Sequence, residues 1–121
     1  MTIPDFQTIM LPLMQIAADG QEHRNRDVTE LLAQHFKFTD EERKALLPSG
    51  RQATFDNRVG WSATHLRKAC LLERTGSGRF HITQRGLEVL QTHPAKIDMQ
   101  LLLQFAEFRA FRERQIVDAN Q

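Results

Sequence analysis

Two constellations in the sequence have residue types that could do chemistry, and the first of them is a nuclease-like string. Asp5 follows a proline, and one residue separates Glu42 from Lys44, which imitates the acid and lysine order of PD-(D/E)xK nucleases. That chemistry needs Glu42 and Lys44 on a strand, where residues two apart share a face. The pattern around them predicts a helix, which places them about 200° apart. The string is therefore interpreted as chance.

Histidine and cysteine usage raises the question of a metal site. No two histidines lie three or four residues apart on one predicted helix, and no CxxC or HExxH motif occurs. No nucleophile motif and no phosphate-binding glycine loop is found either. The chain is therefore not predicted to be an enzyme by itself, and neither a metal nor another cofactor is expected in it. The histidines are His23, His35, His65, His81 and His93.

The second constellation is a basic helix followed by a hairpin, in residues 55–83. Helical spacing divides residues 55–70 into two faces. The face predicted to pack holds Val59, Ala63, Leu66 and Cys70, and the opposite face holds Trp61, Thr64, His65 and Lys68. After it, Phe80 and Ile82 alternate with polar residues, and a Gly-Ser-Gly sequence at 76–78 suits a tight turn. A helix followed by a basic wing is typical of a winged helix-turn-helix.

Charge is distributed unevenly along the chain. The net charge is only +1, so a nucleic-acid site has to be a local patch. Acidic residues outnumber basic ones up to Gly50, and the balance reverses between Arg51 and Leu90. In the DNA-binding interpretation, arginines contact phosphate, Lys68 contacts phosphate or guanine, and three polar side chains face bases. The predicted residues are Arg51, Arg58, Arg67, Arg74, Arg79 and Lys68, with Asn57, Thr64 and His65 toward bases.

Alternatives stay open at this surface. The same charges would also suit a solvated face of any globular protein. Trp61, the single tryptophan, could stack on a sugar or base, but the preferred interpretation is an anchor between packed helices.

The rest of the pattern predicts a mainly α (α+β) chain. A first helix is expected from Phe6 to near Gly20, kinked at Pro12 or starting there. A second helix, with Asn25 as its N-cap, carries an apolar stripe from Val28 to Phe36. Thr39 and Glu42 form a capping box for a short helix to Leu47. Thr83 caps a further helix that ends at His93 before Pro94, and residues 97–112 are strongly helical and apolar.

Composition places the chain among soluble, intracellular proteins. Cys70 has no partner for an internal disulfide and is interpreted as a buried small apolar side chain, which indicates a reducing, cytoplasmic setting. Neither a signal peptide nor an apolar run of about 20 residues is present, so no membrane association is expected.

Five short motifs give the chain a resemblance to a known family. They are Leu47-Pro48-Ser49-Gly50, Asn57-Arg58-Val59-Gly60-Trp61, Leu66-Arg67-Lys68-Ala69 with Leu71-Leu72, Ile82-Thr83-Gln84-Arg85-Gly86, and residues 105–112. Through them the chain resembles the N-terminal domain of Mrr-like restriction endonucleases. The resemblance implies a winged helix with a two-stranded wing, which reads double-stranded DNA for a C-terminal PD-(D/E)xK nuclease domain that uses magnesium and cleaves foreign, often methylated, DNA.

The expected organisation follows from this resemblance. Residues 1–94 are predicted to form the winged-helix DNA-binding domain, and residues 95–121 a C-terminal helix or linker toward a nuclease domain that is absent from this chain. Two features depart from the family pattern: Cys70 replaces a helix-ending glycine, and the wing carries Gly76-Ser77-Gly78 instead of an arginine-glycine pair.

Other functions are also compatible with this sequence. The apolar tail could pack on the first helix, or pair with a second copy as a homodimer helix. The corresponding alternatives to DNA recognition are a protein-interaction module and a transcription regulator.

Overall fold

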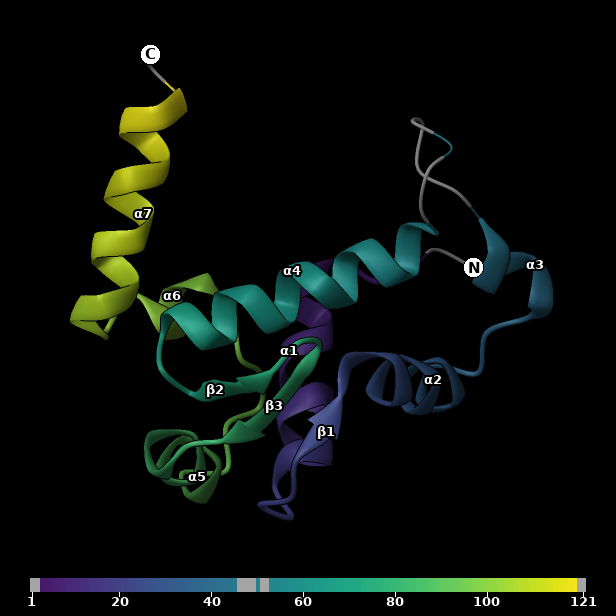
Figure 1. The fold of residues 1–121 in the computed structure, drawn as a ribbon, viewed down its shortest axis with the longest axis horizontal. Coiled ribbons are helices and arrows are strands. Elements are labelled where there is room, and N and C mark those ends of the chain that lie inside the picture. Colours follow the sequence, from purple (N-terminus) through teal and green to yellow (C-terminus); the bar gives the residue numbers. More distant parts are fainter. Residues whose placement is uncertain (1–2, 46–49, 51–52, 120–121) are drawn as a thin grey trace.

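The structure is a computed structural model that describes residues 3–45, 50 and 53–119. Within these residues it contains seven helices and a three-stranded antiparallel sheet, which confirms the predicted mainly helical α+β class. None of the helices described there is long and apolar enough to cross a bilayer. Figure 1 shows the long helix α4 running across the molecule, with the sheet and α5 on one side and α7 rising from the other.

The helices α1 (Phe6–Ala17) and α4 (Thr54–Lys68) form the centre of the fold. The apolar side of α1 is buried at Ile9, Met10, Leu13 and Ala17, whereas Phe6 is half-buried. The N-cap of α1 is Asp5, whose side chain accepts from the Thr8 amide at 2.8 Å. Pro12 lies inside the helix, so the expectation that the helix starts there is wrong. The two helices are joined at Ser62, whose hydroxyl donates to the Phe6 carbonyl at 2.5 Å.

A third strand, missed in the sequence, precedes α2 (Asn25–His35). This strand, β1, contains only His23–Arg24 and pairs with β3. The sheet order is therefore β1-β3-β2, and the predicted two-stranded wing belongs to a three-stranded sheet. The prediction that Asn25 is the N-cap of α2 is wrong: the helix begins at Asn25, and its N-cap is the extended Arg24, which makes no side-chain cap hydrogen bond. The Asn25 amide donates to the Gly78 carbonyl of the hairpin at 2.9 Å.

The hairpin of β2 (Leu72–Gly76) and β3 (Arg79–Ile82) follows α4 as predicted. Leu72 is opposite Ile82 and both are buried, whereas Gly78 in the turn has the positive φ of +67° that glycine permits.

Thr83 joins the end of α4 to the start of α5 (Gln84–Gln91). Its hydroxyl donates to the Cys70 carbonyl at 2.6 Å and accepts from the Gly86 amide at 3.0 Å, while its own amide donates to the Leu71 carbonyl. Cys70 itself is partly exposed and has a φ of +62°, the left-handed conformation of a helix end. A cysteine thus occupies a position that glycine would fill without strain.

The predicted capping box at Thr39 is confirmed, and it begins the short helix α3 (Asp40–Lys44). Arg43 ties α3 to its neighbours through ion pairs with Glu30 of α2 and Asp56 of α4. The helix ends before the predicted Leu47, and residues 46–49, including most of the first resemblance motif, lie outside the described residues.

The C-terminal segment is divided into two helices, α6 (Met99–Leu102) and α7 (Ala106–Ala119), where one long helix was predicted. Its first part packs back on the body, because Ile97, Leu102 and Phe108 are fully buried in the common core. Of the two alternatives for the tail, intramolecular packing thus holds for residues 97–108. The later residues Ile116 and Val117 stay more than half exposed.

Candidate nucleic-acid interface

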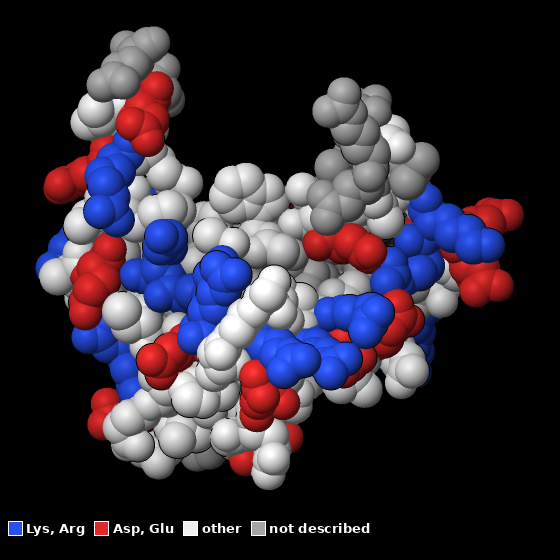
Figure 2. Space-filling view, in the orientation of Figure 1, with Lys and Arg blue, Asp and Glu red and all other residues white. Residues whose placement is uncertain are grey.

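Basic side chains gather on the face that the hairpin and the start of α2 present. Figure 2 shows a band of lysine and arginine crossing the middle of this face, with acidic side chains along its borders. The band joins segments that are far apart in the sequence. This is the local patch that a nearly neutral chain requires for nucleic acid.

Three predicted arginines converge around one small hollow. Arg67 of α4, Arg74 of β2 and Arg79 of β3 line a depression of about 150 Å³, together with Asn25, Gly78 and Phe80. Across the hairpin Arg74 pairs with Phe80 and Gly76 pairs with Arg79, and the register is irregular between Arg74 and Gly76. The hollow is thus lined by arginines from three elements.

Two further arginines, which the sequence did not single out, extend the patch. Arg24 and Arg26 line an adjoining hollow with Asn25, Ser77 and Arg79. Arg24 ends β1 directly opposite Arg79. Both lie in the acidic first half of the chain, so a charge count along the sequence hides them. Only the pairing of β1 with β3, which the sequence did not predict, brings them next to Arg79.

Some of this charge is neutralised within the wing. Glu22 accepts from the Thr75 hydroxyl at 2.8 Å and lies 4.0 Å from Arg79. Glu73 lies 2.9 Å from His81 on the neighbouring strand. Arg74 donates to the Gly76 carbonyl at 3.2 Å, which holds its side chain along the turn. These contacts orient the arginines at the protein surface and leave Arg79 46% exposed.

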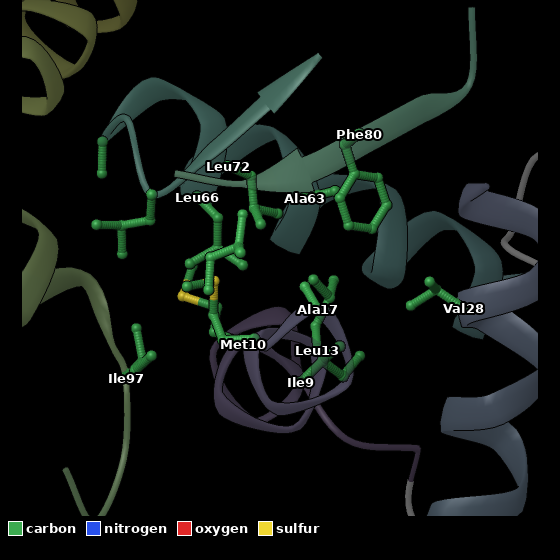
Figure 3. Close-up of a cluster of buried hydrophobic side chains, with 14 of the residues drawn as sticks. Ile9, Met10, Leu13, Ala17, Val28, Ala63, Leu66, Leu72, Phe80 and Ile97 are labelled. Atoms are coloured by element: carbon green, nitrogen blue, oxygen red, sulfur yellow. The ribbon is translucent and has the colours of Figure 1, made fainter. Parts of the chain in front are cut away.

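Figure 3 shows the packed side of α4, where Ala63 and Leu66 point into the core beside α1. This side was predicted correctly for Val59, Ala63 and Leu66, all of which are buried. Asn57, Trp61, Thr64 and Lys68 follow the spacing i, i+4, i+7, i+11, so they share a stripe about 60° wide away from the core. Arg67 borders this stripe on the side of the wing.

The placement of His65 on the free face is wrong. Only 5% of this residue is exposed, because α7 covers it. Its ring centroid lies 4.6 Å from that of Phe6, 5.9 Å from that of Phe108 and 5.8 Å from that of Phe111. Burial lowers the pKa of His65, although the 2.7 Å contact of Nδ1 with the Trp61 carbonyl opposes this effect. His65 is thus a core side chain of this fold and not part of the surface.

Some of the remaining predicted residues are held by contacts within the protein, and others are exposed. Arg58 donates to the carbonyls of Ile3 and Pro4, at 2.7 and 3.2 Å, so its guanidinium holds the N-terminal segment. Thr64 accepts from Arg67 at 3.3 Å. Lys68 is exposed, with its amino group 5.5 Å from the centre of the Phe111 ring. Arg51 lies outside the described residues.

Trp61 does not have the preferred role of a core anchor. It is 46% exposed, and its ring centroid lies 5.8 Å from that of the buried His65. The indole is thus close to one buried ring of the protein while nearly half of the residue is exposed.

The nuclease-like string is not assembled. Asp5 caps α1, and the Glu42 carboxylate accepts from the Thr39 amide at 3.0 Å in the capping box. Glu42 and Lys44 lie on the helix α3, as the sequence indicated. In the part of the chain that the structure describes, no group of three histidine, cysteine or acidic side chains is placed to hold a metal ion.

Comparison with known proteins agrees with the resemblance drawn from the motifs. Residues 6–92 match the family described as the Mrr N-terminal domain, and the chain belongs to this family. It is similar to the type IV methyl-directed restriction enzyme EcoKMrr of Escherichia coli (strain K12), with 29% identity over 101 residues. The match covers 83% of this chain and 33% of that enzyme, so the chain spans about a third of the relative's length. No solved structure matches the chain.

Proposed function

We propose that this chain is the DNA-binding, target-recognition domain of an Mrr-like restriction endonuclease and that it has a winged helix-turn-helix fold. The element order α1-β1-α2-α3-α4-β2-β3, with α3 between the two longer helices, and the sheet order β1-β3-β2 support this fold. The helix α4 then enters the major groove, and the β2–β3 hairpin is the wing. Cleavage and its Mg²⁺ belong to a nuclease domain outside this chain, and the chain works in the cytoplasm where restriction enzymes meet foreign DNA.

The observation that carries the proposal is the convergence of Arg67, Arg74 and Arg79 beside the start of α2. The Glu22 carboxylate lies 4.0 Å from Arg79 and offsets part of this positive charge. Arg24 faces Arg79 across two paired strands, and like charges in that position destabilise a sheet. Arg24 and Arg26 also lie at the N-terminal end of α2, where the helix dipole disfavours cations. A phosphate backbone relieves both repulsions at once.

Asn57, Thr64 and Lys68 complete the proposed surface on α4, with Lys68 on phosphate or guanine and the two polar side chains toward bases. Arg58 and His65 are left out of it, because the first holds the N-terminal segment and the second is buried. Arg51 remains in the proposal as a phosphate contact.

Titration of fluorescein-labelled duplex DNA, followed by anisotropy at several salt concentrations, tests the proposal. The double variant Arg74→Gln, Arg79→Gln is expected to bind more weakly, with a salt slope smaller by about two units, because each phosphate contact contributes about 0.9. Lys37→Gln is the matched control, since Lys37 is exposed and follows the far end of α2. An unchanged affinity and slope in the double variant would refute the proposal.

A second candidate function, assembly through the C-terminal helix, is favoured by the exposed pair Ile116 and Val117 on α7. Light scattering of the chain and of its Ile116→Glu variant tests it. A concentration-dependent dimer that becomes monomeric in the variant supports a homodimer, and a monomer in both refutes it.

A further inference from the structure

The α4 stripe has an apolar centre as well as polar ends. Trp61 is 46% exposed, and Gly60 next to it has open space where a side chain would lie. Among the residues that the structure describes, none would crowd a side chain at Gly60, so the surface beside the exposed indole is open there. An exposed aromatic ring of this size is a common centre of recognition surfaces.

The indole has a buried side chain behind it. Its ring lies beside His65, which is immobilised by Phe6 of α1 and by Phe108 and Phe111 of α7. The carbonyl oxygen of Trp61 is also 2.7 Å from the His65 ring nitrogen. Three helices thus hold the base of the side chain, so little conformational entropy is lost when the ring meets a ligand.

Cations lie farther along α4 than the ring. Lys68 is on the same stripe as Trp61, with its amino group over the Phe111 ring, and Arg67 lines the arginine hollow. A long, negatively charged partner that covers Trp61 can therefore also reach this positive charge, which favours it over an ordinary apolar protein surface. The major groove of DNA combines negative phosphate walls with an apolar group on its floor, the C5-methyl group of thymine or of 5-methylcytosine.

The geometry points to Trp61 as a specificity-determining residue whose indole contacts the C5-methyl group of a pyrimidine in the major groove. This inference rests on the proposed DNA-binding function and names the side chain that recognises the base. Asn57 and Thr64 flank the ring on the same stripe and contact the neighbouring base edges. Phosphate contacts by the arginines give affinity, and the methyl contact gives discrimination.

The test uses a duplex that the chain selects from a random-sequence pool in which every cytosine is 5-methylated. The selected duplex is then compared with two forms of the same sequence, one with unmethylated cytosine and one with uracil in place of thymine. The 121-residue chain is expected to lose about fourfold in affinity for the form that lacks the contacted methyl group, the ratio for one buried carbon. Which form shows the loss identifies the base.

Trp61→Ala is expected to reduce this ratio to about one while the salt slope stays unchanged, and Trp61→Phe to restore part of it. Leu31→Ala is the matched control, because Leu31 on α2 is 45% exposed. Discrimination that persists in Trp61→Ala overturns the inference. If Trp61→Ala keeps the affinity ratio of the unchanged chain while the double variant Arg74→Gln, Arg79→Gln loses DNA binding, only the inference fails. If the unchanged chain binds no duplex, the proposed function fails as well.

Fluorescence gives a second, direct readout, since the chain has one tryptophan and no tyrosine. DNA is expected to shift the emission of Trp61 to shorter wavelength and to protect it from acrylamide. Protection that appears on raising the protein concentration without DNA would instead assign the ring to contact with a second copy and overturn the inference.

Discussion

Arg24 lies directly opposite Arg79 in the antiparallel pairing of β1 with β3. Two arginines at facing positions near the start of α2 are unfavourable for the free protein and favourable for a complex with phosphate. The same pair is therefore expected to lower the stability of the free protein and to raise its affinity for DNA in the proposed function.

Neutralising this pair should separate the two effects. Arg24→Gln is expected to raise the free energy of unfolding by on the order of 0.5 kcal/mol and to lower the salt slope of DNA binding by about 0.9. Urea denaturation and anisotropy measure the two quantities on the same sample. Lys37→Gln, beyond the other end of α2, should change stability in the opposite direction, because the helix dipole favours a cation there. A destabilised Arg24→Gln chain would contradict the electrostatic argument.

Gly86 lies where a side chain cannot fit. A Cβ at this position would stand 2.3 Å from the Leu71 carbonyl oxygen and 2.7 Å from Ile82. Gly86→Ala is therefore expected to lower the free energy of unfolding by about 1–3 kcal/mol, measured by urea denaturation. Gly60→Ala in α4 is the control, since a Cβ added there would meet no atom of the described residues around it within 4 Å, and it should stabilise the helix by up to about 1 kcal/mol. Equal effects of the two changes would be inconsistent with this close approach.

His65 should make stability depend on pH. Burial lowers the pKa of His65 from its ordinary value of 6.5. The unfolded chain then binds a proton more readily than the folded one, so the full stability is present above pH 6.5 and declines as the pH falls below it. The slope is at most about 1.4 kcal/mol per pH unit. Denaturation series between neutral pH and about pH 5 should show a smaller slope for His65→Phe, whereas His35→Gln, at an exposed histidine, should retain it.

Phe108 should make the C-terminal segment part of the folding unit. It is fully buried against the core, and Phe108→Ala is expected to reduce the free energy of unfolding by about 3–5 kcal/mol. Ile116→Ala, at a residue 56% exposed on the same helix, should change it by less than about 0.5 kcal/mol. Guanidinium denaturation of both variants decides whether the fold needs residues beyond 94. A small effect at Phe108 would show that α7 docks only loosely.

Local signals in the sequence predicted most of the elements that present the candidate site. Apolar periodicity gave α1 and the packed side of α4, and the caps at Thr39 and Thr83 marked the starts of α3 and α5. Each of these signals acts within a few residues, which is why a single sequence reveals it.

Contacts between distant segments account for what was missed. The strand β1 is two residues long and exists only through pairing with β3. On a helical wheel His65 lies on the free side of α4, but Phe108 and Phe111 of α7 cover it. The nearer of the two, Phe108, is 43 residues farther along the chain. Arg58 resembles the other arginines in the sequence, yet carbonyls of the N-terminal segment hold it. No local pattern encodes such contacts, so the arginine hollow, with Arg24 and Arg26, became visible only in three dimensions.

The junction at Thr83 has a mechanical consequence for recognition. One side chain closes the end of α4 and begins α5, while its amide fixes the residue before β2. A hinge between helix and hairpin would have to break these hydrogen bonds together. The hairpin is therefore held at one angle to α4, and in the proposed DNA-binding function a duplex would have to adapt its groove width and bend to this fixed surface. Sequences that deform easily would then be favoured even at base pairs that no side chain touches.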